Sequence, residues 1–374
     1  MKNIQKELVE RKLKLVIEKL MNLGEPENQE ELKSEGERIG FFKRDFGITE
    51  WDWPQGVGLY GLWKIMKVQK NEEYRQFLCD WFKRNIEEGL PARNINTTAP
   101  LLTLTELNEE ENNKEWEQTC LDWANWLMNC IPRTKEGGFQ HVVSANGDRK
   151  GVRLNESEMW IDTLFMTVLF LNRIGQKYKK QEWIDESIHQ VLLHIKYLYD
   201  TQTGLFYHGW SFNRMDHFGG IFWCRGNSWF TLGILDYIEM FKGTLNTGVK
   251  TLILDTYRAQ AEKLKELQSK SGLWHTVLLD QSSYEEVSGS AGIVAGILKG
   301  VRLGILDDSY LDCAEKGIQA ILKNIDEDGT VLNVSAGTGV GRNADYYKNI
   351  LIAPMAYGQS LTMLALYEAL CFIQ

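Results

Sequence analysis

Three short turns in this chain combine glycine, an aromatic residue and a histidine, and they recur at an equal spacing. They occupy residues 137–141 (Gly-Gly-Phe-Gln-His), 203–208 (Thr-Gly-Leu-Phe-Tyr-His) and 271–275 (Ser-Gly-Leu-Trp-His). An interval of 67 residues separates His141 from His208 and His208 from His275, which is too long for one helix and fits a helical hairpin with its loops. The spacing predicts a repeat of hairpins, and a ring of hairpins would gather these side chains around one mouth.

Apolar residues recur at helical spacing in twelve segments, whereas strand alternation is almost absent. The segments are 4–22, 54–69, 72–88, 97–108, 113–129, 158–174, 181–199, 222–241, 249–268, 288–303, 309–324 and 353–372. The best strand candidates are 273–279 and then 330–334. Twelve helices make six hairpins, the number expected for a closed toroid.

Two kinds of helix alternate along the chain. The segments at 54–69, 97–108, 158–174, 222–241, 288–303 and 353–372 are poor in charge and rich in small residues, whereas their partners carry dense Lys and Glu on one face. An open solenoid predicts less contrast, because its concave face stays wet. No linker divides the chain, so we predict one all-α domain over residues 1–374, an (α/α)6 barrel.

The charge distribution excludes several classes of partner. The net charge is −9 and no block of Lys and Arg interrupts it, which argues against nucleic acid and anionic membranes. No run of about twenty apolar residues and no signal peptide are visible, and the six cysteines lack metal-site or disulfide spacing and are interpreted as buried thiols. We expect a cytoplasmic protein that binds a small molecule and needs no metal or cofactor; the oligomeric state stays open.

Asp162 is the foremost candidate for chemistry. It lies near the start of an apolar helix between Trp160 and Phe165. Desolvation by aromatic neighbours disfavours the charged form of a carboxyl, which suits an acid that donates a proton near neutral pH. The alternative is an aspartate that complements the dipole at a helix N-terminus.

A second cluster, at 222–229, pairs indoles with polar donors. Trp223 and Trp229 offer flat apolar surfaces, and Arg225 and Asn227 offer planar donors. A sugar needs this mixture, because its C–H face stacks on aromatic rings and its hydroxyls or carboxylate accept hydrogen bonds. The alternative is a pair of core tryptophans with an arginine that caps a neighbouring carbonyl.

The histidines differ in the roles expected of them. His208 is surrounded by aromatic residues in the sequence and is expected to contact substrate, as is His141, whereas His275 is interpreted as structural. His189 and His194 lie in a charged outer segment and are expected to face solvent.

Polar residues also precede other inner helices. We expect Gln55 and Asn96 to contribute to substrate binding together with Ser288, although each position is also suited to an N-cap. For Ser288, which opens a helix, capping is the favoured interpretation.

Seven motifs, in order, resemble the unsaturated rhamnogalacturonyl hydrolases, glycoside hydrolase family 105, which are related to the unsaturated glucuronyl hydrolases. The most telling are Met-Trp-Ile-Asp-Thr-Leu-Phe-Met at 159–166 and Phe-Trp-Cys-Arg-Gly-Asn-Ser-Trp at 222–229. The others are at 53–57, 96–102, 137–141, 204–210 and 287–290. Together they span most of the chain, from about Trp51 to Leu370.

The resemblance implies an (α/α)6 barrel that releases a 4,5-unsaturated uronic acid from the non-reducing end of a lyase-generated pectin fragment by hydrating its vinyl ether. Asp162 matches the family's acid/base, which protonates C4 and then accepts a proton from the water that attacks C5. Substrate-facing positions of the family are matched by Trp53, His141, His208, Trp223, Arg225 and Trp229. Asn96 stands where relatives often carry Asp; an amide there cannot be a base but can hold a hydroxyl or water.

Two other functions remain open from the sequence. Sugar 2-epimerases share the barrel and use pairs of histidines, a role that His208 and His275 would fill. A carbohydrate-binding toroid without turnover would keep the aromatic residues and would not depend on Asp162.

Overall fold

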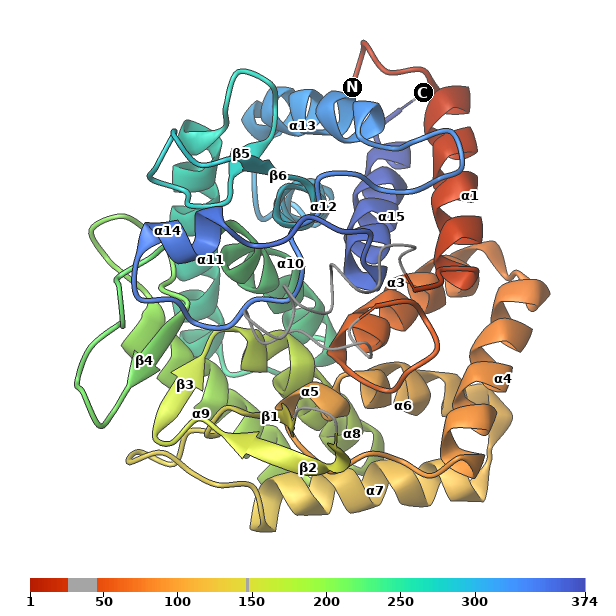
Figure 1. Cartoon of the computed structure of the whole chain (residues 1–374), viewed down its shortest axis with the longest axis vertical. Helices are drawn as coiled ribbons and strands as arrows, with labels where there is room; N and C mark the ends of the chain where they lie inside the picture. Colours follow the sequence, from red (N-terminus) through yellow and green to blue (C-terminus); the bar gives the residue numbers. More distant parts are fainter. Residues whose placement is uncertain (26–45, 146–147, 374) are drawn as a thin grey trace.

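Six inner helices form a closed ring in the computed structural model, which describes residues 1–25, 46–145 and 148–373. They are α3 (Trp53–Gln69), α6 (Pro100–Glu111), α8 (Leu169–Tyr178), α10 (Cys224–Met240), α12 (Val287–Arg302) and α15 (Ala356–Leu370). Each contacts the next along the chain, and α15 contacts α3, so the ring closes (Figure 1). The predicted (α/α)6 barrel is confirmed, because inner helices can be packed on both sides only when the first meets the last.

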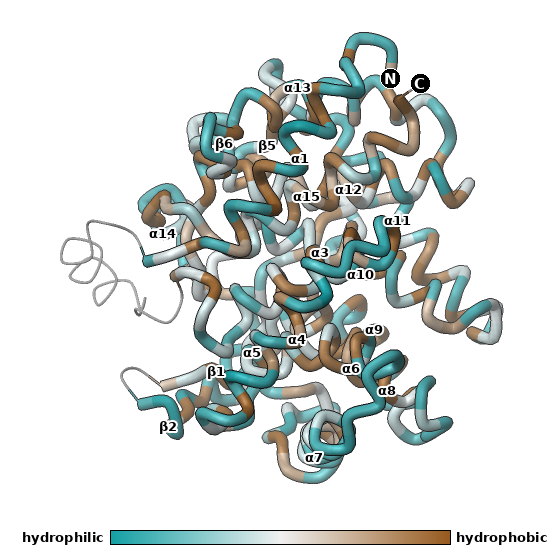
Figure 2. The backbone as a smooth tube through the Cα atoms, turned by 90° about the vertical axis from the view of Figure 1, so that its right-hand side faces the viewer, coloured by the Kyte–Doolittle hydropathy of each residue, from teal (hydrophilic) through white to brown (hydrophobic). Residues whose placement is uncertain are grey.

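Six outer helices cover this ring. They are α1 (Lys6–Met21), α4 (Glu72–Glu87), α7 (Lys114–Asn129), α9 (Gln181–Leu198), α11 (Thr247–Leu267) and α13 (Leu311–Lys323). Hydrophobic and hydrophilic residues alternate along them (Figure 2), as expected for helices with one wet face. The first outer helix, α1, packs against the last inner helix, α15, and the two ends of the chain lie side by side (Figure 1).

The three glycine turns confirm the hairpin repeat. The turn at 137–141 lies between outer helix α7 and inner helix α8, the turn at 203–208 between α9 and α10, and the turn at 271–275 between α11 and α12. The inner helices α8, α10 and α12 therefore each follow an equivalent turn.

Short strands were mostly missed by the helical prediction. Strand β1 (Val142–Ala145) pairs with β2 (Asp148–Leu154), β3 (Glu158–Trp160) with β4 (Gly209–Ser211), and β5 (Trp274–His275) with β6 (Glu285–Glu286). The expectation of strand structure in 273–279 is confirmed over β5, whereas 330–334 supplies only a single bridge from Val331 to Ile325. The prediction that a helix begins at residue 158 is wrong, because residues 158–160 form a strand that pairs with residues 209–211, far along the chain.

Three helical details also differ from the prediction. The segment 97–108 is divided into α5 (Ile95–Thr98) and α6, which starts at Pro100, where a proline suits the first turn. The residues after Asp162 form a π-helical turn, η2 (Leu164–Val168), before α8. A five-residue helix, α14 (Ala344–Lys348), is too short for periodicity to reveal.

Glycines set the spacing between α10 and α12. A Cβ on Gly296 would lie 2.6 Å from the backbone oxygen of Thr231, and a Cβ on Gly289 would lie 2.7 Å from the backbone nitrogen of Arg225. Backbone atoms cannot move aside as a flexible side chain does, so the two helices pack at this distance only with glycine.

We therefore expect Gly296→Ala to lower the free energy of unfolding by about 1–3 kcal/mol, as overpacking does. Urea unfolding measures the change. The control is Gly248→Ala in the exposed first turn of α11, whose Cβ would make only an ordinary contact at 3.4 Å. Equal stability of the two variants would contradict the close packing of α10 and α12.

The cysteines are less uniformly buried than the sequence predicted. All six are free thiols, but Cys130 and Cys371 are exposed and Cys79 is partly buried. Within 1–25, 46–145 and 148–373, none of the helices combines the length and apolar composition that crossing a bilayer requires.

Candidate active site

Asp162 lies at the junction between β3 and the π-helical turn η2. Its side chain is 13% exposed, and its Oδ2 is 3.2 Å from Nε2 of His208, whose side chain is 1% exposed. The distance fits an ion pair, yet neither atom forms a hydrogen bond of regular geometry within the described residues. Buried polar atoms rarely stay unsatisfied, so both retain the capacity to bind a substrate group or a water.

Two opposing effects act on the Asp162 carboxyl. Burial raises its pKa, whereas the adjacent His208 and, after it, His141 lower it, and the net result is a pKa below the usual value. The sequence-based expectation that aromatic neighbours keep this acid protonated is therefore wrong for the free protein. The contact with His208 outweighs desolvation, because it stabilises the charged form directly.

A chain of ring contacts begins next to Asp162. The rings of His141 and Trp160 stack with centroids 4.0 Å apart, Trp160 meets His208 edge-on at 5.7 Å, and His208 lies 4.4 Å from Trp223. Burial lowers the pKa of His141 to about 3, so this imidazole is neutral, and its Nδ1 is 3.2 Å from the hydroxyl of Thr163. The structure thus brings together the two histidines predicted to contact substrate.

The same chain of contacts returns to the segment after Asp162. The guanidinium of Arg225 lies over the rings of Trp223 and Tyr357, at 4.5 and 4.7 Å. Tyr357 stacks on Trp53 at 4.6 Å. Trp53 meets Trp229 at 6.3 Å, and Trp229 meets Phe165 at 5.0 Å. These rings form an aromatic cluster next to Asp162, contributed by six segments of the chain: residues 53, 141, 160–165, 208, 223–229 and 357.

Arg225 forms its hydrogen bonds within the protein and does not face an open surface. The side chain is fully buried, and its two terminal nitrogens donate to backbone and hydroxyl oxygens of Ser335, Ala336 and Thr338. Glu286 lies 3.6 Å away and is also fully buried. Arg225 therefore holds the loop 335–338 in place, as the capping alternative supposed.

Ser288 and Asn227 are also occupied within the fold. The N-cap of α12 is Glu286, whose carboxylate accepts from the backbone of Ser288 and Gly289, so the expectation that Ser288 caps this helix is wrong. The Ser288 hydroxyl donates to Glu286 at 2.6 Å. The Asn227 amide bonds both the N–H and the C=O of Phe206, so both side chains shape the site through their neighbours.

Two further predicted residues differ in their availability. Gln55 is buried and donates to the carbonyl oxygens of Phe46 and Gly47. Asn96 is partly exposed, because the cap of its short helix is Asn94, which forms a reciprocal capping box with Thr97. Among the described residues, the Asn96 amide has no hydrogen-bond partner in the protein, which suits a residue that binds a hydroxyl or water.

Known proteins share this architecture and its sequence. The family model described as Glycosyl Hydrolase Family 88 matches residues 33–373. The chain belongs to glycosyl hydrolase family 88. It is 35% identical to the unsaturated rhamnogalacturonyl hydrolase YesR of Bacillus subtilis over 328 residues, 87% of this chain and 90% of that protein.

Solved structures agree with this family membership. A possible member of family GH105 from Salmonella enterica superposes with a TM-score of 0.90 at 36% identity, covering 99% of this chain and 95% of that one. The unsaturated glucuronyl hydrolase of Bacillus sp. GL1 superposes with a TM-score of 0.64 at 18% identity, covering 98% and 97%. The latter similarity concerns the fold alone.

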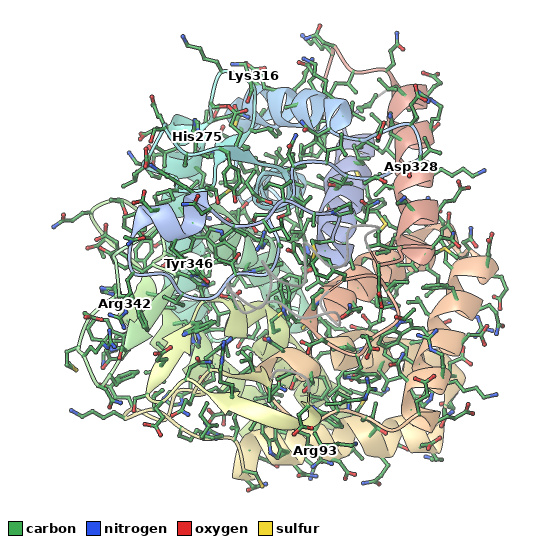
Figure 3. All side chains as sticks on the ribbon, in the orientation of Figure 1. Arg93, His275, Lys316, Asp328, Arg342 and Tyr346 are labelled. Atoms are coloured by element: carbon green, nitrogen blue, oxygen red, sulfur yellow. The ribbon has the colours of Figure 1, made fainter. Side chains whose placement is uncertain are left out.

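The remaining histidines of this family 88 protein do not belong to the aromatic cluster next to Asp162. His275 has its Nδ1 2.5 Å from the carbonyl oxygen of Ser283 and lies away from the barrel centre in Figure 3. His189 is exposed as predicted, but His194 is fully buried, which corrects the sequence interpretation. Its Nε2 lies 3.2 Å from the carbonyl oxygen of Trp160, so His194 supports the strand that precedes Asp162.

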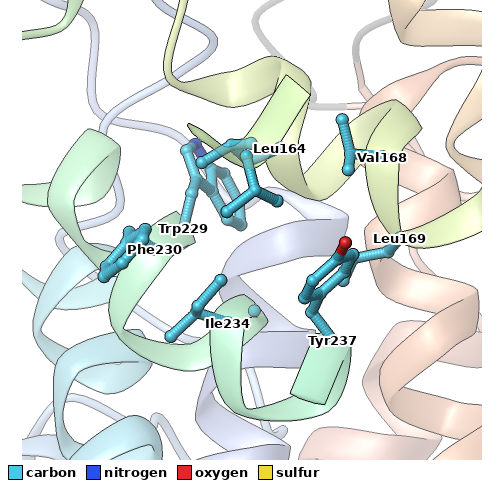
Figure 4. Close-up of a pocket in the computed structure, with 9 residues that line it drawn as sticks. Leu164, Val168, Leu169, Trp229, Phe230, Ile234 and Tyr237 are labelled. Atoms are coloured by element: carbon cyan, nitrogen blue, oxygen red, sulfur yellow. The ribbon is translucent and has the colours of Figure 1, made fainter. Parts of the chain in front are cut away.

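An apolar cavity lies beneath the π-helical turn (Figure 4). Leu164 and Val168 line it from the turn, and Trp229, Ile234 and Tyr237 line it from α10. The lining offers no charged groups, so this cavity does not suit a sugar and is separate from the polar atoms of Asp162 and His208. In the described part of the chain, no group of three or more His, Cys, Asp or Glu side chains is arranged to hold a metal ion.

Sequence reasoning missed two residues that complete the site. Tyr357 lies between Trp53 and Arg225, and Tyr347 contacts His208 through its hydroxyl. Neither tyrosine was named from the sequence, although the polar segment 341–346 directly precedes Tyr347. Only the fold brings these late segments to the mouth of the barrel.

Proposed function

We propose that this family 88 protein releases a 4,5-unsaturated uronic acid from the non-reducing end of an oligosaccharide by adding water across the C4=C5 bond. The observation that carries the proposal is the pairing of Asp162 with a histidine, not with a second carboxylate, within the described residues. Glycosidases that act at the anomeric carbon use two carboxyl groups at defined separations. A single carboxyl suits a reaction in which one group gives and takes the same proton.

The proton transfers balance on Asp162 alone. The carboxylic acid protonates C4, and the resulting carboxylate accepts a proton from the water that attacks C5. The product is a hemiketal at C5, whose ring opens and releases the aglycone together with a keto sugar. An Nε2–H of His208, 3.2 Å from Oδ2, stabilises the carboxylate that forms in the first transfer, which makes Asp162 a stronger acid.

Substrate binding is expected to raise the pKa of Asp162 and so to supply the protonated acid that the free protein lacks. Asp162 has a lowered pKa and is ionised at neutral pH before binding. An unsaturated uronate brings its own carboxylate towards this site and excludes water, and both effects raise the pKa of a neighbouring carboxyl. The acid form is therefore favoured in the complex, where it is needed.

Rhamnogalacturonan-type pectin fragments are the proposed substrate class. The relative YesR is named for unsaturated rhamnogalacturonyl substrates, and the partly exposed Trp53 and the free amide of Asn96 suit a sugar ring. The protein is incubated with a panel of lyase-generated unsaturated disaccharides while the ultraviolet absorbance of the conjugated double bond is followed. We expect absorbance loss with a rhamnose aglycone; an unchanged absorbance with every member would contradict the proposal.

The alternative functions are less well supported. An epimerase would use His208 with His275, but His275 is bonded to the carbonyl oxygen of Ser283 and is not part of the aromatic cluster. A binding toroid without turnover does not explain why a carboxyl and an imidazole face each other with unsatisfied atoms. The cytoplasmic location, the single domain over 1–374, and a protein without nucleic-acid, membrane, metal or cofactor requirements stay predictions.

The pH dependence of kcat/KM gives a further test. His208 lowers the pKa of Asp162, so His208→Ala is expected to raise it. If the protonated acid is the active form, kcat/KM falls as pH rises above this pKa, and the fall begins at higher pH in the variant. A His208→Gln variant, whose amide can still donate, should shift less. A descending limb that moves to lower pH, or does not move, would contradict the assigned roles.

A further inference from the structure

A buried tyrosine contacts the far side of the His208 ring. The hydroxyl of Tyr347 is 2.8 Å from Nδ1 of His208, and the backbone N–H of Gly341 donates to the same hydroxyl at 3.0 Å. Tyr347 is fully buried. His208 is therefore held between two groups, with Tyr347 at Nδ1 and Asp162 at Nε2.

The hydrogen-bond inventory of the phenol decides the direction of these bonds. Its oxygen accepts from Gly341, so its own proton needs an acceptor. Nδ1 of His208 is the acceptor that the described residues place within reach. A buried O–H without an acceptor is costly, so the arrangement with O–H donating to Nδ1 is favoured. Burial also raises the pKa of Tyr347, which keeps the phenol a donor.

This direction fixes the state of the imidazole. A neutral histidine carries one ring proton, and when Nδ1 accepts from Tyr347 that proton must be on Nε2. The Nε2–H then faces the Asp162 carboxyl. With the opposite tautomer, a lone pair on Nε2 would face the carboxylate, and the two would repel each other.

The position of Tyr347 depends on contacts between distant segments. It lies in α14, 139 residues after His208, and its partner Gly341 follows the loop 335–338 that Arg225 holds. Gly341 packs against Tyr346, because a Cβ there would lie 2.2 Å from the Tyr346 ring. The loop, the short helix and the histidine thus form one connected unit.

We propose that Tyr347 is a positioning residue that sets the tautomer of His208, so that Nε2 carries the proton towards Asp162. Its effect on the reaction rests on the proposed function, since His208 must stabilise the carboxylate formed when Asp162 protonates the sugar. The tautomer itself does not depend on which substrate the protein uses.

The direct test is the ¹⁵N spectrum of the protein labelled at its histidine rings, with the His208 signals identified by their loss in His208→Gln. Protonated and unprotonated ring nitrogens differ clearly in ¹⁵N shift. We expect the wild type to carry its proton on Nε2, and Tyr347→Phe to move the His208 population towards the Nδ1–H form. A wild type with Nδ1–H, or a variant with unchanged His208 signals, would overturn the proposal.

The matched control is Tyr346→Phe, the neighbouring tyrosine, which is partly exposed and whose ring lies against Tyr347; none of the contacts among the described residues joins it to His208. We expect it to leave the His208 signals in place. In activity measurements, Tyr347→Phe should lower kcat by at least about tenfold, as loss of an orienting group does, with a smaller change in KM. If no unsaturated sugar is turned over, the proposed function fails, while the spectrum still decides the tautomer.

Discussion

Asp162→Asn is expected to lower kcat/KM for an unsaturated disaccharide by at least about 10³-fold, since general acid–base groups contribute about 10²–10⁴-fold and Asp162 serves in both steps. An amide cannot deliver a proton to C4 or accept one from water. It has nearly the shape of the carboxyl and can still accept from His208, so substrate binding should persist. Initial rates of absorbance loss measure the effect, and calorimetric titration measures binding.

The control is Asp255→Asn on the exposed face of α11, which removes one partner of a surface pair with Arg258. It should retain wild-type activity. If Asp162→Asn kept more than a tenth of the wild-type kcat/KM while remaining folded, the assignment of Asp162 as the acid would be wrong.

The second large effect concerns stability at the other end of the barrel. Asp236 of α10 is buried against Lys299 of α12 and Lys64 of α3, with Nζ of Lys64 2.5 Å from Oδ1, and it accepts from the hydroxyl of Tyr60 at 3.0 Å. Asp236→Asn leaves the buried Lys299 ammonium without this counterion. Removing one partner of a buried pair costs about 3–5 kcal/mol. We expect urea unfolding to show a loss of that size.

The pH dependence of stability has a definite sign. Burial raises the pKa of Asp236, but the two lysines lower it by more than burial raises it, so the pKa lies well below the usual value. A carboxyl with a lowered folded-state pKa contributes stability above its unfolded pKa of about 3.9 and loses that contribution as pH falls through the folded value. The difference between wild type and Asp236→Asn should therefore shrink in acid.

A surface pair provides the control for this prediction. Glu18→Gln removes a partner of Lys14 in an exposed pair, and such pairs contribute about 0–1 kcal/mol. Asp236→Asn should also leave kcat/KM of the folded protein unchanged, because Asp236 lies near the C-terminal end of α10 and the site lies at the other. Equal stability of the two variants would contradict a buried network between the inner helices.

The barrel could be predicted because its physical causes are local. An outer helix needs a charged face and an inner helix needs small apolar residues, and both patterns repeat along the chain. Gly289 and Gly296 illustrate this, since they look like ordinary small residues in the sequence and prove to define the distance between α10 and α12. The buried His194 shows where this reasoning fails: it was expected to face solvent because its helix is charged, but a charged outer helix still has one buried face.

The site could be predicted only where motif and chemistry coincide. Asp162, His141 and His208 were identified from aromatic neighbours and from resemblance, and the structure brings them together. The roles of Arg225 and Tyr347 depend on contacts between distant residues: Arg225 bonds Ser335, 110 residues further along the chain, and Tyr347 bonds His208, 139 residues before it. No local pattern records such contacts, so a guanidinium that holds a loop looks like one that binds a sugar.

Hydrolysis of an unsaturated disaccharide in D₂O, followed by ¹H NMR from the first turnovers, tests the central claim most directly. Hydration from Asp162 predicts that the vinyl H4 signal disappears in step with aglycone release, and that C4 of the keto sugar gains one deuterium in a single orientation. Aglycone release accompanied by a free unsaturated monosaccharide with an intact H4 signal would show displacement at the anomeric carbon, and would contradict the account.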